Sequence, residues 1–103
     1  MHELLRQKEL PTAVCCINDE IAVGAMGVAL DRGMRIPEDI VFTGFDGVDL
    51  SRQFRPQLTT IQMDFETMGK QLAELTLSSI KGEKQIRDVV VDPWVELRKS
   101  TGD

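Results

Sequence analysis

The chain has 103 residues, 42% of them hydrophobic and 28% charged, with 12 Lys and Arg against 17 Asp and Glu for a formal net charge of −5. That composition predicts one small globular domain and excludes two complete ones. The acidic balance and scattered basic residues argue against nucleic-acid binding by this chain alone, because phosphate contacts need a basic patch. No apolar run reaches the roughly 20 residues that span a bilayer, and residues 1–10 lack a secretion-signal layout. We therefore expect a cytoplasmic chain that does not enter membranes.

The two cysteines, Cys15 and Cys16, are neighbours in an apolar run. Adjacent residues of a strand point to opposite faces, so a disulfide between them is disfavoured. No His or further Cys stands at a metal-ligand spacing. The pattern predicts two small buried hydrophobic side chains, no metal site and no cofactor.

The chain opens with a helix-like segment followed by a strand. Residues 1–10 (MHELLRQKEL) fit the end of an amphipathic helix, which Pro11 stops. Residues 13–17 (AVCCI) are apolar throughout, which is typical of a strand buried on both faces of a parallel sheet.

A helix is predicted over residues 20–32. Asn18 and Asp19 supply N-cap chemistry before it, and apolar residues then recur at helical spacing. Gly33 stands where a left-handed C-terminal cap needs a residue without a Cβ.

A second buried strand is predicted over residues 40–45 (IVFTGF), after a turn at residues 37–39. A strand, a helix and a strand joined by brief turns form a right-handed βαβ unit with parallel strands. The expected fold class is therefore α/β.

The second half of the chain has weaker signals. Residues 52–58 are expected to be irregular and residues 59–61 to form a short strand. Asp64 is predicted to cap a helix that closes at Lys81. The remaining strand candidates are residues 89–91 and 95–97, separated by Pro93 and Trp94.

Polar residues follow two adjacent predicted strands: Asn18 and Asp19 after the first, and Asp46 after the second. In open α/β sheets, ligands bind beyond the carboxyl ends of the strands. A carboxylate beside an amide suits the recognition of vicinal hydroxyls, because the carboxylate accepts from two hydroxyl donors. No nucleophile with a base and no metal cluster is visible in the pattern, which favours binding over catalysis.

Each of these residues also has a purely structural interpretation. Asn18 and Asp19 could serve as helix caps alone, which is the favoured role for Asp19. Asp46 and Gly47 could form a plain turn. Phe54 and Trp94 are more often packing residues than ligand stackers. The glycines form no phosphate-binding motif.

Three segments together resemble the effector-binding region of the LacI/GalR family of bacterial transcription regulators, which shares its fold with type I periplasmic sugar-binding proteins. They are PTAVCCINDEIAVGA at residues 11–25, GMRIPEDIVFTGFD at residues 33–46 and RPQLTTI at residues 55–61. The closing VELRKSTG is also similar to the last strand of the family.

The resemblance implies a partial effector-binding and dimerisation domain, a parallel-sheet βαβ piece of the periplasmic-binding-protein type I fold, spanning residues 1–103. Residues 1–10 would be a truncated helix end, and residues 11–62 the βαβ core of the second lobe. Residues 63–92 would be a helix and strand that cross to the first lobe in relatives. Residues 93–103 would be the closing strand and tail.

The resemblance also implies site residues. Asn18 and Asp46 match positions that hold ligand hydroxyls in sugar-binding relatives. Met63 stands where relatives often have Gln, a departure that implies a less polar ligand or puts the pattern in doubt. The implied dimer residues are Val23, Met26, Gly27 and Phe54, although Met26 could equally belong to the core of the domain.

The predicted function is effector sensing and dimerisation within a LacI/GalR-type regulator, without catalysis. The implied partners are a sugar-like small molecule, a second copy of the chain, and DNA only through a headpiece absent from this chain. A transport-type sugar-binding protein and a truncated product that pairs with full-length subunits are the alternatives.

Overall fold

The computed structural model describes residues 1–83 and 88–103, which form two compact units. The sheet unit comprises Met1–Gln62 with Trp94–Asp103, and the helix unit comprises Met63–Pro93. The predicted segment 63–92 includes residues 84–87, which lie outside the described residues. Within the described ranges, no helix is long and apolar enough to cross a membrane.

The sheet unit is built on four strands in the spatial order β1-β2-β3-β4. Their bounds are Ala13–Cys15, Val41–Asp46, Thr59–Gln62 and Trp94–Glu96. β1 and β2 are parallel, as the sequence predicts, and β3 is parallel to β2, whereas β4 pairs with β3 in the antiparallel sense. The fold is therefore α/β with a mixed, mostly parallel sheet.

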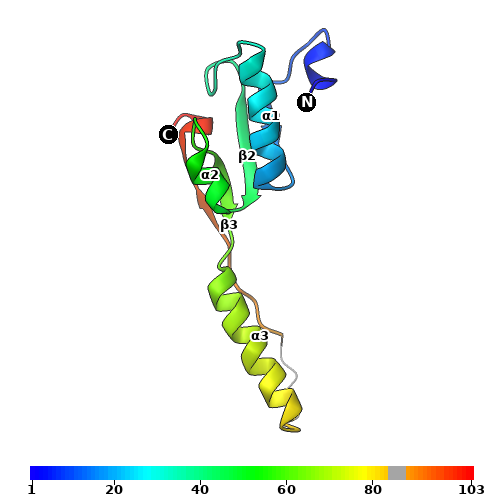
Figure 1. Ribbon diagram of the computed structural model, residues 1–103, viewed down its shortest axis with the longest axis vertical. Coiled ribbons are helices and arrows are strands. Elements are labelled where there is room, and N and C mark those ends of the chain that lie inside the picture. The colour runs from blue at the N-terminus through cyan, green and yellow to red at the C-terminus, as the bar shows by residue number, and fades with distance from the viewer. Residues whose placement is uncertain (84–87) are drawn as a thin grey trace. The chain divides into compact units, whose positions relative to one another are not determined.

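The α1 helix, Asp19–Asp31, lies against β2 (Figure 1) and confirms the helix predicted over residues 20–32. The Asn18 side chain caps it by accepting a hydrogen bond from the Ile21 N–H. Gly33 follows with φ of 77°, a left-handed conformation that is strained for residues with a Cβ.

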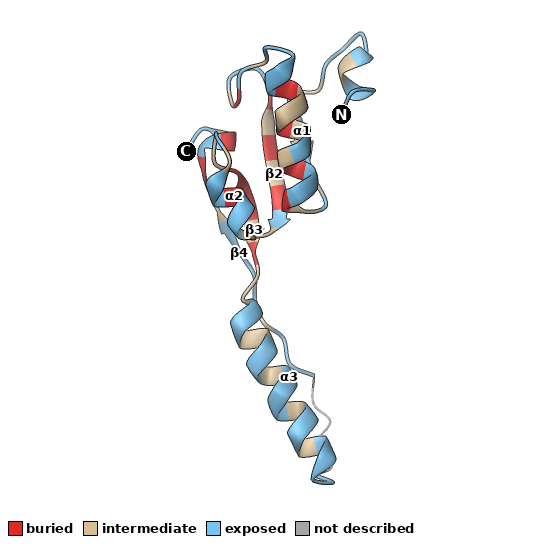
Figure 2. Cartoon of the chain, in the orientation of Figure 1, coloured by how far each residue is buried: buried red, intermediate tan, exposed pale blue. Residues whose placement is uncertain are grey.

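The core lies between α1 and one face of the sheet (Figure 2). Phe42 and Met26 are fully buried there and are its largest side chains. The other buried hydrophobic residues are Ala22, Ala29, Ile36, Ile40 and Leu58.

The opposite face of the sheet carries no helix from the sheet unit, which corrects the prediction of strands buried on both faces. Phe42 faces α1, so the flanking Thr43 and Phe45 point the other way, and Phe45 is exposed. Cys15 lies on the same open face, beside a groove of about 350 Å³ that Phe45 also lines. In the sheet unit, β1 and β2 are thus covered on one face, instead of on both faces as predicted.

The cysteines also differ from the prediction of two buried side chains. Cys15 is exposed, and Cys16 is half-buried and packs against the core. Burial raises the pKa of the Cys16 thiol above its ordinary value, and the neighbouring Cys15 adds to that shift. Both effects favour the protonated thiol of Cys16 over the reactive thiolate.

Four shorter segments depart from the prediction. Residues 1–10 contain a 3-10 helix, Leu4–Arg6, instead of the end of an α-helix. A short helix, α2 at Asp49–Gln53, overlaps the segment expected to be irregular. Residues 89–91 form no strand, and β4 begins at Trp94. A further 3-10 helix, Lys99–Thr101, follows it.

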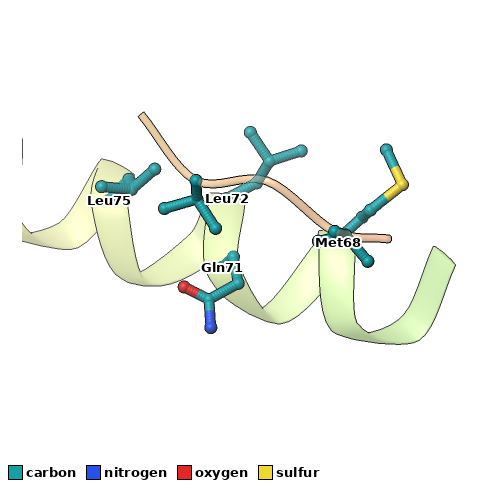
Figure 3. Close-up of a pocket in the computed structure, with 6 residues that line it drawn as sticks. Met68, Gln71, Leu72 and Leu75 are labelled. Carbon is teal, nitrogen blue, oxygen red and sulfur yellow. The ribbon is translucent and has the colours of Figure 1, made fainter. Parts of the chain in front are cut away.

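In the helix unit, α3 runs from Phe65 to Ile80 and is capped by Asp64, which confirms the prediction. Its apolar residues face residues 88–92 across a cavity of about 160 Å³ (Figure 3). That cavity is lined by Met68, Gln71, Leu72, Leu75, Val89 and Val91. Gln71 is the single polar residue among the described residues that line it, and these residues offer little for recognising a polar ligand.

Candidate functional site

The predicted ligand residues lie at one edge of the sheet unit. The parallel strands β1 and β2 pair through Cys15 and Thr43, so their carboxyl ends meet at the same edge. Asp46 is the last residue of β2, and Asn18 precedes α1 just beyond β1. This is the edge where parallel α/β sheets bind ligands.

Asn18 serves as a cap and keeps one polar group available. Its Oδ1 accepts the Ile21 N–H at 2.9 Å, which confirms the capping role. Its amide NH₂ makes no hydrogen bond to the part of the chain that the structure describes, and the residue is half-buried. Asn18 can therefore donate a hydrogen bond to a ligand while it caps α1.

Asp46 has an unusual backbone conformation. Its φ is 95°, and among the described residues it is the one non-glycine residue with positive φ. Gly47 follows with φ of 74°, so the chain turns sharply here. The turn and the ligand interpretations are thus compatible. A non-glycine residue in this region costs backbone energy, and such residues cluster at functional sites.

The Asp46 carboxylate also lacks partners. Within the described residues its side chain makes no hydrogen bond, and the residue is half-buried. Its oxygens are therefore available to accept hydrogen bonds from a ligand.

Gln62 borders Asp46 and Arg52 contacts Gln62, and the sequence pattern assigned no role to either. Gln62 pairs with Asp46 in the register of β2 and β3, and it is 9% exposed. Its Nε2 donates to the Gly47 carbonyl at 3.1 Å, and Arg52 donates to its Oε1 at 3.4 Å. A Cβ at Gly47 would overlap the Gln62 side chain, so the close approach of Gln62 needs a glycine at position 47.

Asp19 does not cap α1, which corrects the role that the sequence favoured for it. It is fully buried, and its carboxylate accepts hydrogen bonds from the Val48 N–H at 2.9 Å and the Thr60 hydroxyl at 2.5 Å. These partners lie before α2 and in β3, far away in sequence. Asp19 therefore joins three segments of the fold below the sheet edge.

The candidate dimer residues fall into two groups. Met26 is fully buried in the core of its own chain, so it is corrected to a core residue with no side-chain surface for a partner. Val23 and Gly27 of α1 and Phe54 after α2 are half-buried. These three stay candidates for a partner surface.

The fold and this edge define a ligand-binding domain of the open α/β type, in which a parallel sheet presents polar side chains beyond its strand ends. The family described as "Periplasmic binding protein-like domain" matches residues 1–101. The chain belongs to this family and corresponds to part of the effector-binding domain of LacI-type regulators.

Two curated relatives are transcriptional repressors. The HTH-type transcriptional repressor PurR of Haemophilus influenzae (strain PittEE) is 38% identical over 97% of this chain and 31% of its own length. PurR of Pectobacterium atrosepticum is also 38% identical, over the whole of this chain and 30% of its own. The chain thus spans about a third of the length of these relatives. Both are named as repressors and not as enzymes, in line with the expected absence of catalysis.

Two solved structures of LacI-type proteins are also similar to this chain. A LacI family transcriptional regulator from Enterococcus faecium with bound ribose is 34% identical, with a TM-score of 0.88 over 97% of this chain and 37% of that one. A Lac repressor dimer bound to operator and an anti-inducer is 30% identical, with a TM-score of 0.87 over 96% of this chain and 30% of that one.

Proposed function

We propose that the chain is the effector-sensing and dimerising part of a LacI-type transcription regulator that binds a small polyhydroxy molecule. The observation that carries the proposal is the half-buried Asp46 carboxylate, which has no hydrogen-bond partner among the described residues and stands at the carboxyl end of β2.

The chemistry of the edge supports a ligand with vicinal hydroxyls. The two carboxylate oxygens of Asp46 can each accept a hydroxyl hydrogen bond, and the Asn18 NH₂ can donate to a third ligand oxygen. A relative with bound ribose supports this choice, as does a cellobiose complex of the regulator CelR, 28% identical to this chain. A nucleoside also carries vicinal hydroxyls and is kept as a test compound.

In this proposal, the ligand shifts the equilibrium between two arrangements of the whole regulator, and the dimer transmits that shift. Val23, Gly27 and Phe54 contribute to the dimer contact. DNA is bound by a headpiece outside this chain, in the cytoplasm. The repressor names of the relatives favour this regulator over a transport-type sugar-binding protein.

The test is isothermal titration calorimetry of the full-length regulator with D-ribose, cellobiose and adenosine. Replacing Asp46 with Ala should weaken binding of the preferred compound by about 1–3 kcal/mol, because a hydrogen bond to a charged group is lost. Asp49→Ala is the matched control, because Asp49 is an exposed carboxylate three residues further along, in α2. Equal affinities of the wild type and Asp46→Ala would return Asp46 to the role of a turn residue.

A further inference from the structure

The turn after Asp46 is held at a single peptide group. The Gly47 carbonyl and the Val48 N–H belong to the same peptide plane. Gln62 donates to that carbonyl at 3.1 Å, and Asp19 accepts from that N–H at 2.9 Å. The Gly47–Val48 peptide, one peptide beyond the Asp46–Gly47 bond, is therefore held at both of its polar ends by two buried side chains.

The surroundings of Asp19 stabilise its carboxylate in the position where it accepts a hydrogen bond from the Val48 N–H. It is fully buried in the first turn of α1, where the helix dipole favours a negative charge. A buried carboxylate is costly unless it is hydrogen-bonded, and the Val48 N–H and the Thr60 hydroxyl supply two charge-assisted bonds. Its position is thus determined by α1, β3 and the turn together.

Asp19 and Gln62, the two side chains that hold this peptide, each pack tightly against a glycine. A Cβ at Gly44 would overlap the Asp19 carboxylate and crowd Leu58, and a Cβ at Gly47 would overlap Gln62. On the side where Gly44 and Gly47 lie, neither the Asp19 nor the Gln62 side chain has free volume to move into. The turn with positive φ at Asp46 and Gly47 therefore lies between β2 and a peptide that is held on both sides.

From this geometry we infer that Asp19 is a positioning residue for the ligand site: it fixes the Gly47–Val48 peptide and thereby the direction of the Asp46 carboxylate. The inference rests on the proposed function in taking Asp46 as a ligand contact. A binding group that is already in place before the ligand arrives loses less freedom on binding, which raises affinity.

The decisive variants are Asp19→Ala and Asp19→Asn. Alanine leaves the Val48 N–H and the Thr60 hydroxyl without their acceptor. Asparagine can accept from the Val48 N–H through Oδ1 and donate to Thr60 Oγ1 through Nδ2. The Thr60 hydroxyl then turns to the Ile61 carbonyl, 3.4 Å away. Asparagine should therefore rescue the position of the turn.

Thr59→Val is the matched control for lost stability. Thr59 is 3% exposed, and its hydroxyl bonds to Arg98 at the end of β3 remote from Asp46. Loss of the Thr59 hydroxyl should lower Tm without moving the turn at Asp46 and Gly47. Gln62→Met is a second route to the same test, because it removes the donor to the Gly47 carbonyl and leaves Asp19 intact.

The first readout needs no ligand. In NMR spectra of the full-length regulator, Asp19→Ala and Gln62→Met should shift the Asp46 and Gly47 resonances, and Asp19→Ala should speed hydrogen exchange at the Val48 amide. Asp19→Asn and Thr59→Val should leave these signals near wild type. Unchanged Asp46 signals in both Asp19→Ala and Gln62→Met would overturn the inference.

The second readout is affinity for the tightest binder among D-ribose, cellobiose and adenosine, measured well below each Tm. Asp19→Ala should weaken binding about tenfold, equivalent to 1.4 kcal/mol, with Asp19→Asn close to wild type. An equal loss in Thr59→Val would overturn the inference. If Asp46→Ala leaves affinity unchanged, the proposed function fails on its own, while the NMR signals still decide whether Asp19 positions the turn.

Discussion

Gly44 of β2 lies so close to Asp19 of α1 that a Cβ on Gly44 would overlap the Asp19 carboxylate. Both residues are fully enclosed in the sheet unit, and the Asp19 carboxylate in turn holds the Val48 N–H and the Thr60 hydroxyl. The absence of a side chain at position 44 is therefore what admits a carboxylate into the interior of the fold.

Replacing Gly44 with Ala should destabilise the fold by about 1–3 kcal/mol, because an added methyl group in a filled interior forces its neighbours to move. Gly24→Ala is the matched control. Gly24 lies within α1, and a Cβ there meets nothing within 4 Å. The control should be neutral or stabilising by about 0.5–1 kcal/mol, since alanine favours the helix. Urea unfolding curves measure both, and equal effects of the two substitutions would contradict the packing argument.

The proposed dimer contact can be tested at Gly27, because a Cβ there meets nothing within 4 Å of its own chain. Gly27→Arg should leave the protomer folded and weaken dimerisation, since a charged side chain would enter a contact formed by Val23 and Phe54. Gly24→Arg, on the same helix and equally open, is the control. Sedimentation equilibrium of the full-length regulator gives the dimer dissociation constants, and a wild-type constant for Gly27→Arg would remove Gly27 from the interface.

Acid titration should report the ion pair between Arg35 and Asp39. The Arg35 side chain donates to both Asp39 oxygens, at 3.0 and 2.6 Å, and its backbone N–H donates at 2.7 Å. These bonds lower the pKa of Asp39 from 3.8 to about 2. The pair stabilises the fold fully above pH 3.8, and that contribution is lost as the pH falls through about 2.

Carbon-13 NMR of the Asp39 carboxyl measures this titration directly. Arg35→Gln should return its midpoint towards 3.8. Arg32→Gln should not, because Arg32 contacts His2 instead of Asp39. A wild-type midpoint near 3.8 would show that the pair does not hold in solution.

Sequence patterns correctly predicted those elements whose caps and apolar spacing lie in the element itself or directly beside it. The α1 and α3 helices have their caps, Asn18 and Asp64, and their apolar spacing in adjacent residues. Burial of the strands was mispredicted because the covering of a face depends on distant segments. An all-apolar run such as residues 13–17 looks the same whether one face or both are covered.

The candidate site was predictable only in its position. Strand ends and polar residues located Asn18 and Asp46 at one edge. The roles of Asp19 and Gln62 depend on partners 29 and 15 residues away, in Val48 and Gly47. Tertiary folding sets such pairings, so the sequence favoured a cap at Asp19 and gave no role to Gln62.

The α3 helix has consequences for how the chain opens. None of its 16 residues is buried, and its local stabilisers are the Asp64 cap on Thr67 and the Glu66–Lys70 pair. An isolated helix of about this length is marginal in water. The helix unit should therefore fray and reform many times for each opening of the sheet. A protease that cleaves unfolded segments should therefore cut the chain first within α3, while β2 and β3 are still paired.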